Sequence, residues 1–253
     1  MNIKIVEILK KSSDAVTSIV NVTFSFGEQS IIDPDNGEEV KVYGIDKEKN
    51  SDLLSFHGNT SYTLINLNDC LDDLVFFETL FSAEHYPSFI NDNYFSQYFK
   101  VTYQHWLIKT NTLFDCILHA TNAVFELGLK HQYVNSNTVM DNTKIYSSDR
   151  LYEKLKIIKK LLEKKFKAAR NSIIHRNEFH HQEIDEIAGA GSDWFLILNE
   201  LDKIDIQVKI GNTSNKLKEE ISYINFQLAT TVLEIIEILF TEYKKRFANK
   251  IQR

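Results

Sequence analysis

Glycine and proline are scarce in this sequence, with 8 Gly and 2 Pro among 253 residues. A β-sandwich or a β-barrel needs many tight turns, and tight turns rely on these two residue types. Their scarcity therefore argues against an all-β fold and favours helices. With 43% hydrophobic residues, the chain is long and apolar enough to bury a sizeable core, as one large domain or two small ones.

Cysteine and long apolar runs are scarce too. The two cysteines, Cys70 and Cys116, form no Cys-x-x-Cys pattern, so we expect free thiols in a reducing compartment. The first residues lack the basic stretch and the apolar run of a signal peptide. No unbroken run of 18 apolar residues is present, so we expect no membrane span. We therefore expect a cytoplasmic protein with no membrane partner.

The expected fold class is mainly α: an up-and-down helical bundle with a small N-terminal region that has candidate β-strands. We expect residues 1–93 to form an α+β or mostly β region of unknown role, and residues 94–253 to form the bundle. In the first region, a turn is predicted at residues 33–37 and a short helix at residues 71–81. Strands are predicted where Val, Ile, Thr and aromatic residues partly alternate, at residues 16–26, 39–45 and 60–67.

Three long helices are predicted in the second region. The first covers residues 95–127 and is followed by Gly128, a natural helix stop. The second begins near Ser148 and Asp149, which are good N-cap residues. The third covers residues 215–248, and its apolar residues recur at every third or fourth position: Leu217, Ile221, Ile224, Leu228, Val232, Ile235 and Leu239. The connecting segments are predicted as a polar loop and a short strand, at residues 132–147 and 204–210.

Positive charge is concentrated in one segment. The net charge of the chain is −6, yet residues 150–176 hold ten Lys or Arg residues and only two acidic residues. Cations that neutralise phosphates supply most of the non-specific affinity of proteins for nucleic acid. This local excess indicates an RNA partner, and the residues expected to contact it are Lys160, Lys164, Lys167 and Arg176. A lysine-rich, solvated helix face is the simpler alternative.

The residue types needed for phosphodiester cleavage follow one another at the end of the second predicted helix. Arg170 is followed directly by Asn171, and His175 comes five residues after Arg170. A guanidinium holds a phosphate through two parallel hydrogen bonds, and an imidazole exchanges a proton near neutral pH. Cleavage of a phosphodiester needs both functions, and Asn171 can orient either group. We therefore expect Arg170, His175 and Asn171 to form a catalytic site.

Helix geometry limits how this site can assemble. Five residues along a regular helix rotate by about 140° and rise by about 7.5 Å. Arg170 and His175 therefore do not lie on one helix face. They converge if Arg170 reaches along the helix, if the helix ends near His175, or if a second chain completes the site. The third option makes a dimer the natural arrangement.

The Arg-x4-His run, within this order of helices, resembles the motif of the HEPN superfamily, and the resemblance covers roughly residues 95–250. It implies a helical bundle that dimerises with two motifs facing each other across a cleft. It also implies an endoribonuclease without metal or other cofactor, in which the substrate 2′-hydroxyl attacks the adjacent phosphate and leaves a 2′,3′-cyclic end. Arg170 and His175 would be catalytic and Asn171 supporting.

The resemblance also implies partners. Domains of this kind are common in abortive-infection and toxin–antitoxin proteins. The implied partners are RNA, a second copy of the chain, and a cognate antitoxin or a nucleotidyltransferase-like protein.

Other interpretations remain open. A non-catalytic HEPN-like module would use the same residues to bind RNA, a nucleotide or a protein. In an unrelated helical interaction protein the motif would be a coincidence. Arg170 and His175 would then have a structural role such as helix C-capping. His180 and His181 have carboxylates nearby, as a metal site would, but they match no His-Glu-x-x-His signature. Cys116 and His119 have the composition of a catalytic dyad, although a partly buried histidine is the more ordinary explanation of His119.

Overall fold

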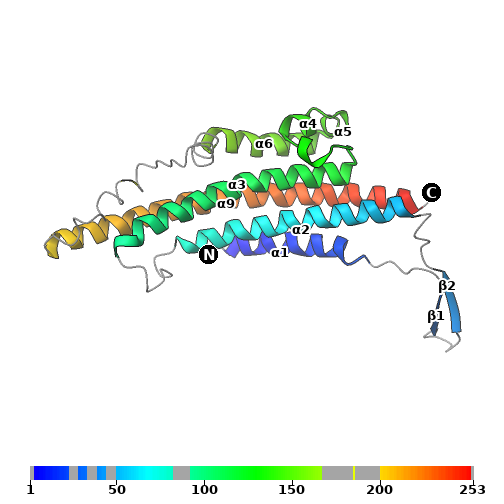
Figure 1. Cartoon of the computed structure of the whole chain (residues 1–253), viewed down its shortest axis with the longest axis horizontal. Coiled ribbons are helices and arrows are strands. Elements are labelled where there is room, and N and C mark those ends of the chain that lie inside the picture. Colours follow the sequence, from blue (N-terminus) through cyan, green and yellow to red (C-terminus); the bar gives the residue numbers. More distant parts are fainter. Residues whose placement is uncertain are drawn as a thin grey trace.

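The computed structural model describes residues 3–22, 28–32, 39–43, 50–81, 92–166, 185 and 200–251. Its elements are α1 (Ile3–Val20), β1 (Glu28–Ile32), β2 (Glu39–Tyr43), α2 (Ser51–Leu80), α3 (Asp92–Phe125), the 3-10 helix η2 (His131–Tyr133), α4 (Ser136–Met140), α5 (Thr143–Tyr146), α6 (Asp149–Lys165) and α9 (Glu200–Ile251). Figure 1 shows α2, α3 and α9 lying along a common axis. The described part of the chain is a mainly α bundle, as the sequence predicts.

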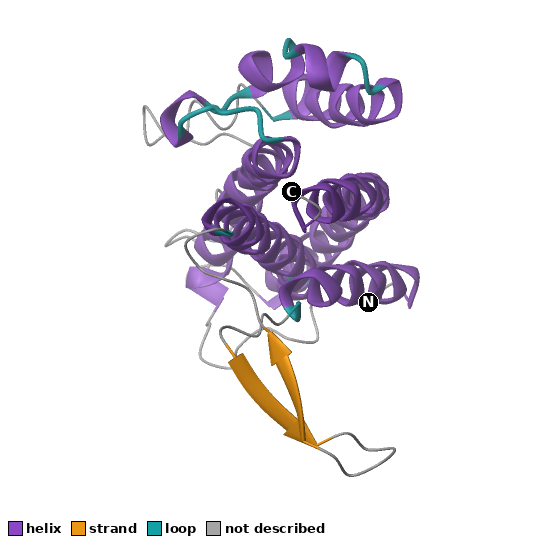
Figure 2. Cartoon of the chain, turned by 90° about the vertical axis from the view of Figure 1, so that its right-hand side faces the viewer, coloured by secondary structure: helices purple, strands orange, loops and turns teal. Residues whose placement is uncertain are grey.

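Helix α9 is central to this bundle, because it packs against α1, α2, α3 and α6. Helices α4, α5 and α6 lie on the opposite side of α3 and α9 from α1, as both Figure 1 and Figure 2 show. Buried residues of the helices from α1 to α9 form one continuous hydrophobic core. Helix α6 is therefore an outer helix, with one face on the core and the other exposed.

The predicted apolar stripe of the last helix is confirmed. Each of its seven residues, from Leu217 to Leu239, is at most 1% exposed. Helix α9 is longer than predicted, however, and residues 204–210 belong to it, so the short strand predicted there was wrong. Alternating β-branched residues favour a strand only weakly. Extending a helix that has already nucleated adds one hydrogen bond per residue, and here that gain prevails.

Helix α9 is also a candidate membrane span by its length and composition. Within Gly211–Ile251, a window of mean hydropathy 1.4 meets the length and composition of a spanning helix, and 44% of that window is buried inside the protein. The same composition is typical of the core helix of a bundle. Packing of α9 against four other helices accounts for its apolar stripe without a bilayer.

The N-terminal region is more helical than predicted. The strand predicted at residues 60–67 was wrong, because these residues lie inside α2, and the helix predicted at residues 71–81 is the second half of α2. The strand predicted at residues 16–26 was wrong over residues 16–20, which lie in α1, and its residues 23–26 lie outside the described residues. The buried positions of α2 have helical spacing: Thr60, Leu64, Leu67, Leu71 and Leu74. Tyr62 and Ile65 are apolar but exposed, so apolar and polar residues partly alternate in this segment, as they would in a strand.

The strand predicted at residues 39–45 is confirmed over Glu39–Tyr43, which form β2. It pairs with β1 in an antiparallel hairpin whose register places Ile32 opposite Glu39. The turn predicted at residues 33–37 lies outside the described residues. The described content of residues 1–93 is therefore α+β and not mostly β. Helices α1 and α2 also share the core with α3 and α9, so residues on both sides of position 93 contribute to one core.

The predicted end of the first long helix and the predicted beginning of the second agree with the structure. Helix α3 ends at Phe125, and Gly128 follows with a φ of 75°, a left-handed conformation that favours glycine. Ser148 is the N-cap residue of α6, although its side chain makes no capping hydrogen bond. The segment predicted as a polar loop holds the short helices η2, α4 and α5. Asn135 begins α4 with a capping box, which satisfies backbone N–H groups at the start of this short helix.

Candidate functional site

The predicted catalytic residues Arg170, Asn171 and His175 lie outside the described residues, as do Lys167 and Arg176. The structure describes the two helices that bracket them. Helix α6 leads to the motif and ends at Lys165, and α9 begins after it at Glu200. The structure therefore shows the two helices between which the motif segment runs: the end of α6 before it and the beginning of α9 after it.

Phe166 anchors the start of that segment. It is the C-cap residue of α6, its backbone N–H donates to the Leu162 carbonyl at 2.9 Å, and its side chain is only 3% exposed. The ring meets the Trp106 ring edge-on, with the centroids 5.4 Å apart. Because Phe166 lies four residues before Arg170, the chain enters the motif from a fixed point on the core.

A buried polar network lies directly beneath this anchor. The indole Nε1 of Trp106 donates to Oδ1 of Asn225 at 2.9 Å. The Asn225 amide nitrogen donates to the Leu74 carbonyl at 3.0 Å and lies 3.4 Å from Oε2 of Glu78. One amide thus connects α2, α3 and α9, all at buried positions. A satisfied buried network of this kind fixes side-chain positions more strictly than apolar packing alone.

Among the described lysine side chains of α6, three are paired with a neighbouring residue and Lys160 is not. Lys154 forms an ion pair with Glu234 of α9, and Lys159 donates to Asn137 of α4 at 3.2 Å, so both hold α6 to its neighbours. Lys156 pairs with Glu153 along the helix. Lys160 is exposed and has no partner within the described part of the chain. Of the predicted RNA contacts, Lys160 is therefore free on the surface, and Lys164 lies in the last turn of α6.

His119 is a half-buried residue of the bundle, as the ordinary explanation holds. Its ring stacks on His131, with the centroids 4.2 Å apart. Burial and the neighbouring His131 lower the pKa of His119, against a smaller raising effect of Asp115. The polar neighbour of the Cys116 thiol is Cys70: a hydrogen bond between the two thiols raises the pKa of Cys70 and lowers that of Cys116. This arrangement gives a Cys116–His119 dyad no support.

The lowered pKa of His119 gives a stability prediction. A histidine whose folded pKa lies below its unfolded value of 6.5 stabilises the protein above that pH, and the contribution is lost as the pH falls. We expect the free energy of unfolding, measured in urea, to decrease between pH 7.5 and pH 5.5, and to decrease less in His119→Gln. Burial also lowers the pKa of His57, so some pH dependence should remain. Equal slopes in wild type and variant would contradict this assignment.

No group of three or more His, Cys, Asp or Glu side chains in the described ranges is placed to hold a metal ion. His180 and His181, the alternative metal ligands, lie outside those ranges.

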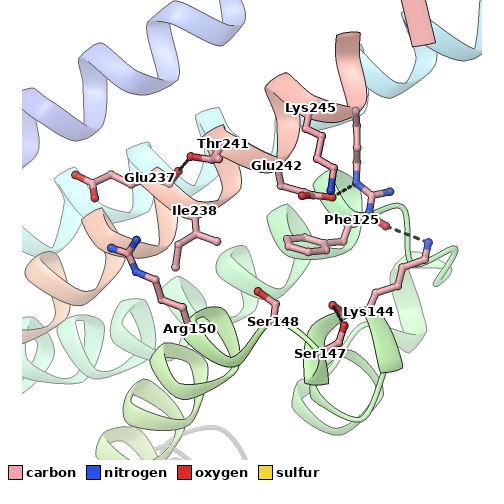
Figure 3. Close-up of a pocket in the computed structure, with 11 residues that line it drawn as sticks. Phe125, Lys144, Ser147, Ser148, Arg150, Glu237, Ile238, Thr241, Glu242 and Lys245 are labelled. Carbon is pink, nitrogen blue, oxygen red and sulfur yellow. Dashed lines mark hydrogen bonds and ion pairs between the residues drawn. The ribbon is translucent and has the colours of Figure 1, made fainter. Parts of the chain in front are cut away.

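Sequence reasoning missed two features of the described structure. Asn225 was recognisable as a polar residue directly after Ile224 of the buried stripe, but nothing in the sequence indicated its partners. The second feature is a cavity of about 650 Å³ between the start of α6 and the end of α9 (Figure 3). Its lining comes from three segments far apart in the chain, so no local motif marks it.

A long-helix bundle with an Arg-x4-His run between its last two long helices is the arrangement of a HEPN domain. The family model described as HEPN_Cthe2314-like HEPN matches residues 58–245, and the chain belongs to this family. The matched range includes the Arg170–His175 motif and the helices on both sides of it. Comparisons with curated proteins and with solved structures found no match.

Proposed function

We propose that this protein is a metal-independent endoribonuclease of the HEPN type that acts as a homodimer with a composite site. The observation that carries the proposal is the family match over residues 58–245, which contains Arg170, Asn171 and His175 at the spacing of the HEPN motif. The buried Phe166 supports it further, because this residue places the beginning of the motif segment against the core.

The chemistry follows from the residue types. The ribose 2′-hydroxyl attacks the adjacent phosphorus and loses its proton, and the bond from phosphorus to the 5′-oxygen of the next nucleotide breaks. His175 acts as the general acid or base for one of these proton transfers. The Arg170 guanidinium stabilises the negative charge that develops on the phosphate oxygens, and Asn171 orients either group. The products carry a 2′,3′-cyclic phosphate and a 5′-hydroxyl.

A second copy completes the site in this proposal. Arg170 and His175 point about 140° apart on a regular helix, so the guanidinium of one copy and the imidazole of the other meet more easily than two groups of one copy. Sedimentation analysis should therefore give twice the mass of the 29.4 kDa chain. A monomer at the concentrations at which RNA is cleaved would contradict the composite site.

The exposed Lys160 is proposed to contact the RNA backbone. Replacing it with alanine should weaken RNA binding and reduce the slope of log affinity against log salt by about 0.7, the value for one phosphate contact with a single strand. Fluorescence anisotropy with a labelled RNA at several salt concentrations measures this slope. Lys10→Ala is the matched control, because Lys10 is also exposed but lies on α1, across the bundle from α6 (Figure 1). Identical slopes for both variants would exclude Lys160 from the interface.

The direct test of the proposal is cleavage of end-labelled RNA by the purified protein in the presence of EDTA. We expect fragments that carry 2′,3′-cyclic phosphate ends. Cleavage that EDTA abolishes would contradict the metal-independent mechanism and point to His180 and His181. Binding without cleavage, across several RNAs, would identify a non-catalytic HEPN module. In a toxin–antitoxin or abortive-infection setting, a cognate antitoxin or nucleotidyltransferase-like partner would restrain the activity, and adding it to the assay should suppress cleavage.

A further inference from the structure

The two cysteines of the chain lie on neighbouring helices that run in opposite directions. Cys70 is on α2 and Cys116 is on α3. These helices pack against each other, and Figure 1 shows the colours of the sequence running in opposite senses along them. Because the sequence holds 2 Cys, any disulfide within one chain joins these two residues.

The antiparallel packing brings the two thiols together. The Cys70 thiol donates to the Lys109 carbonyl of α3 at 3.6 Å. A carbonyl in a helix accepts from the N–H four residues later, so the Lys109 carbonyl lies level with Leu113. Side chains point toward the N-terminus of their own helix, so Cys70 and Cys116 point toward each other on two antiparallel helices. Their thiols are joined by a hydrogen bond.

The two thiols differ in exposure and in acidity. Cys70 is only 3% exposed, whereas Cys116 is half-buried. The hydrogen bond from Cys70 and the charge of Lys109 lower the pKa of Cys116, against the raising effects of burial and of Asp115. The same hydrogen bond, together with burial, raises the pKa of Cys70. A soluble oxidant therefore reaches Cys116 first, and Cys70 is placed to react with the oxidised product.

We propose that Cys116 and Cys70 are an oxidation site for hydrogen peroxide and form a disulfide that joins α2 to α3. First, the Cys116 thiolate attacks one peroxide oxygen and the O–O bond breaks. The departing hydroxide takes up the proton that Cys116 released and leaves as water, so sulfur is oxidised to a sulfenic acid and the peroxide is reduced. Then the Cys70 sulfur attacks the Cys116 sulfur, the S–O bond breaks, and the departing hydroxide takes the Cys70 proton. Two thiols and one peroxide thus give one disulfide and two waters.

The disulfide stabilises the folded bundle. It closes the chain between Cys70 and Cys116 into a loop, which lowers the entropy of the unfolded state. It also adds a covalent link between two helices that the Asn225 network already connects through hydrogen bonds. The site uses neither RNA nor the Arg170–His175 motif, so the proposal does not depend on RNA cleavage.

The test exposes the reduced, full-length protein to hydrogen peroxide after the reductant has been removed. Remaining thiols are then blocked with a maleimide, and the protein is digested without reduction for mass spectrometry. We expect a peptide pair linked through Cys70 and Cys116, the loss of both free thiols, and a single-chain band on a non-reducing gel. Dithiothreitol should restore both thiols. The oxidised protein should melt about 5–10 °C above the reduced protein, as expected for a disulfide that closes a long loop.

Cys70→Ala and Cys116→Ala each keep one thiol, and each is the matched control for the other. Cys116 alone should form a sulfenic acid, trapped with dimedone, about tenfold faster than the buried Cys70 alone, because access and thiolate character set the rate. In urea the two variants should react at equal rates.

The wild-type measurement needs no variant, so it remains decisive if either substitution prevents folding. The proposal would be overturned by wild-type thiols that stay free in the native protein but oxidise in urea, or by a disulfide that joins two chains. Faster oxidation of Cys70 than of Cys116 would also overturn it, and so would an oxidised protein that does not melt above the reduced one.

Discussion

His175→Ala is expected to lower the rate of RNA cleavage by about 10²–10⁴-fold, the usual contribution of a general acid or base. The imidazole is proposed to move a proton during the attack of the 2′-hydroxyl or the departure of the 5′-oxygen, and alanine leaves water to do so. Single-turnover cleavage of a labelled RNA, with enzyme in excess, measures the chemical step directly.

The matched control for this variant is His180→Ala. His180 lies in the same segment, five residues after His175, and is outside the motif. The His180→Ala variant should cleave RNA at close to the wild-type rate, and both variants should bind RNA as wild type does. If His180→Ala lost activity and His175→Ala kept it, the assignment of the motif would be wrong and the histidine pair at 180 and 181 would be the better candidate.

Substitutions of Arg170 separate charge from geometry. Arg170→Ala should reduce the rate by about 10²–10³-fold, as the loss of one fixed donor to a developing oxyanion does. Arg170→Lys keeps the positive charge but loses the planar pair of donors, so it should recover only part of the activity. Full activity of Arg170→Lys would show that a point charge suffices and that bidentate phosphate binding is not required.

Asn225→Ala is expected to lower the free energy of unfolding by about 3 kcal/mol. The change removes the acceptor of the Trp106 indole N–H and a donor to the Glu78 carboxylate, and it leaves a small cavity among α2, α3 and α9. Each buried polar group left without a partner costs about 1–3 kcal/mol. Urea denaturation with wild type and variant measures the difference.

Gln227→Ala is the matched control for Asn225. Gln227 lies two residues further along α9, and its amide bonds to Tyr223 on the exposed face of the helix. Its loss should cost less than about 0.5 kcal/mol, as surface changes usually do. Equal effects of the two substitutions would contradict the role given to the buried network. Because Trp106 also supports Phe166, the folded fraction of Asn225→Ala should in addition cleave RNA more slowly than wild type.

The helices could be predicted wherever one face of the helix is apolar and the other polar. The stripe of α9 and the beginning of α6 at Ser148 are clear in the sequence, because core burial and solvent exposure are separated there. Helix α2 was misread because Tyr62, Ile65 and Phe76 put apolar side chains on its exposed face. Helix α1 was missed for the opposite reason, because a polar residue lies on its buried face. Ser12 is buried, and its hydroxyl donates to Asn68 of α2.

The candidate site could be predicted only where its residues are neighbours in the sequence. Arg170, Asn171 and His175 form such a run, and the family match over residues 58–245 includes it. The support beneath the motif could not be predicted, because Trp106 and Asn225 are 119 residues apart and meet only through the packing of α3 on α9. The same holds for Arg150 and Lys245, which only the fold brings to one pocket.

The most direct measurement of the central claim uses one RNA in two forms: an all-ribose strand, and the same strand with a single 2′-deoxyribose at the mapped cleavage position. Both are incubated with the protein and EDTA, and the fragment ends are identified by mass spectrometry. We predict that the all-ribose strand yields a 2′,3′-cyclic phosphate at that position, while the 2′-deoxy strand is left intact there. Cleavage of both strands at that position at equal rates would show that the 2′-hydroxyl is not the nucleophile and would contradict the account.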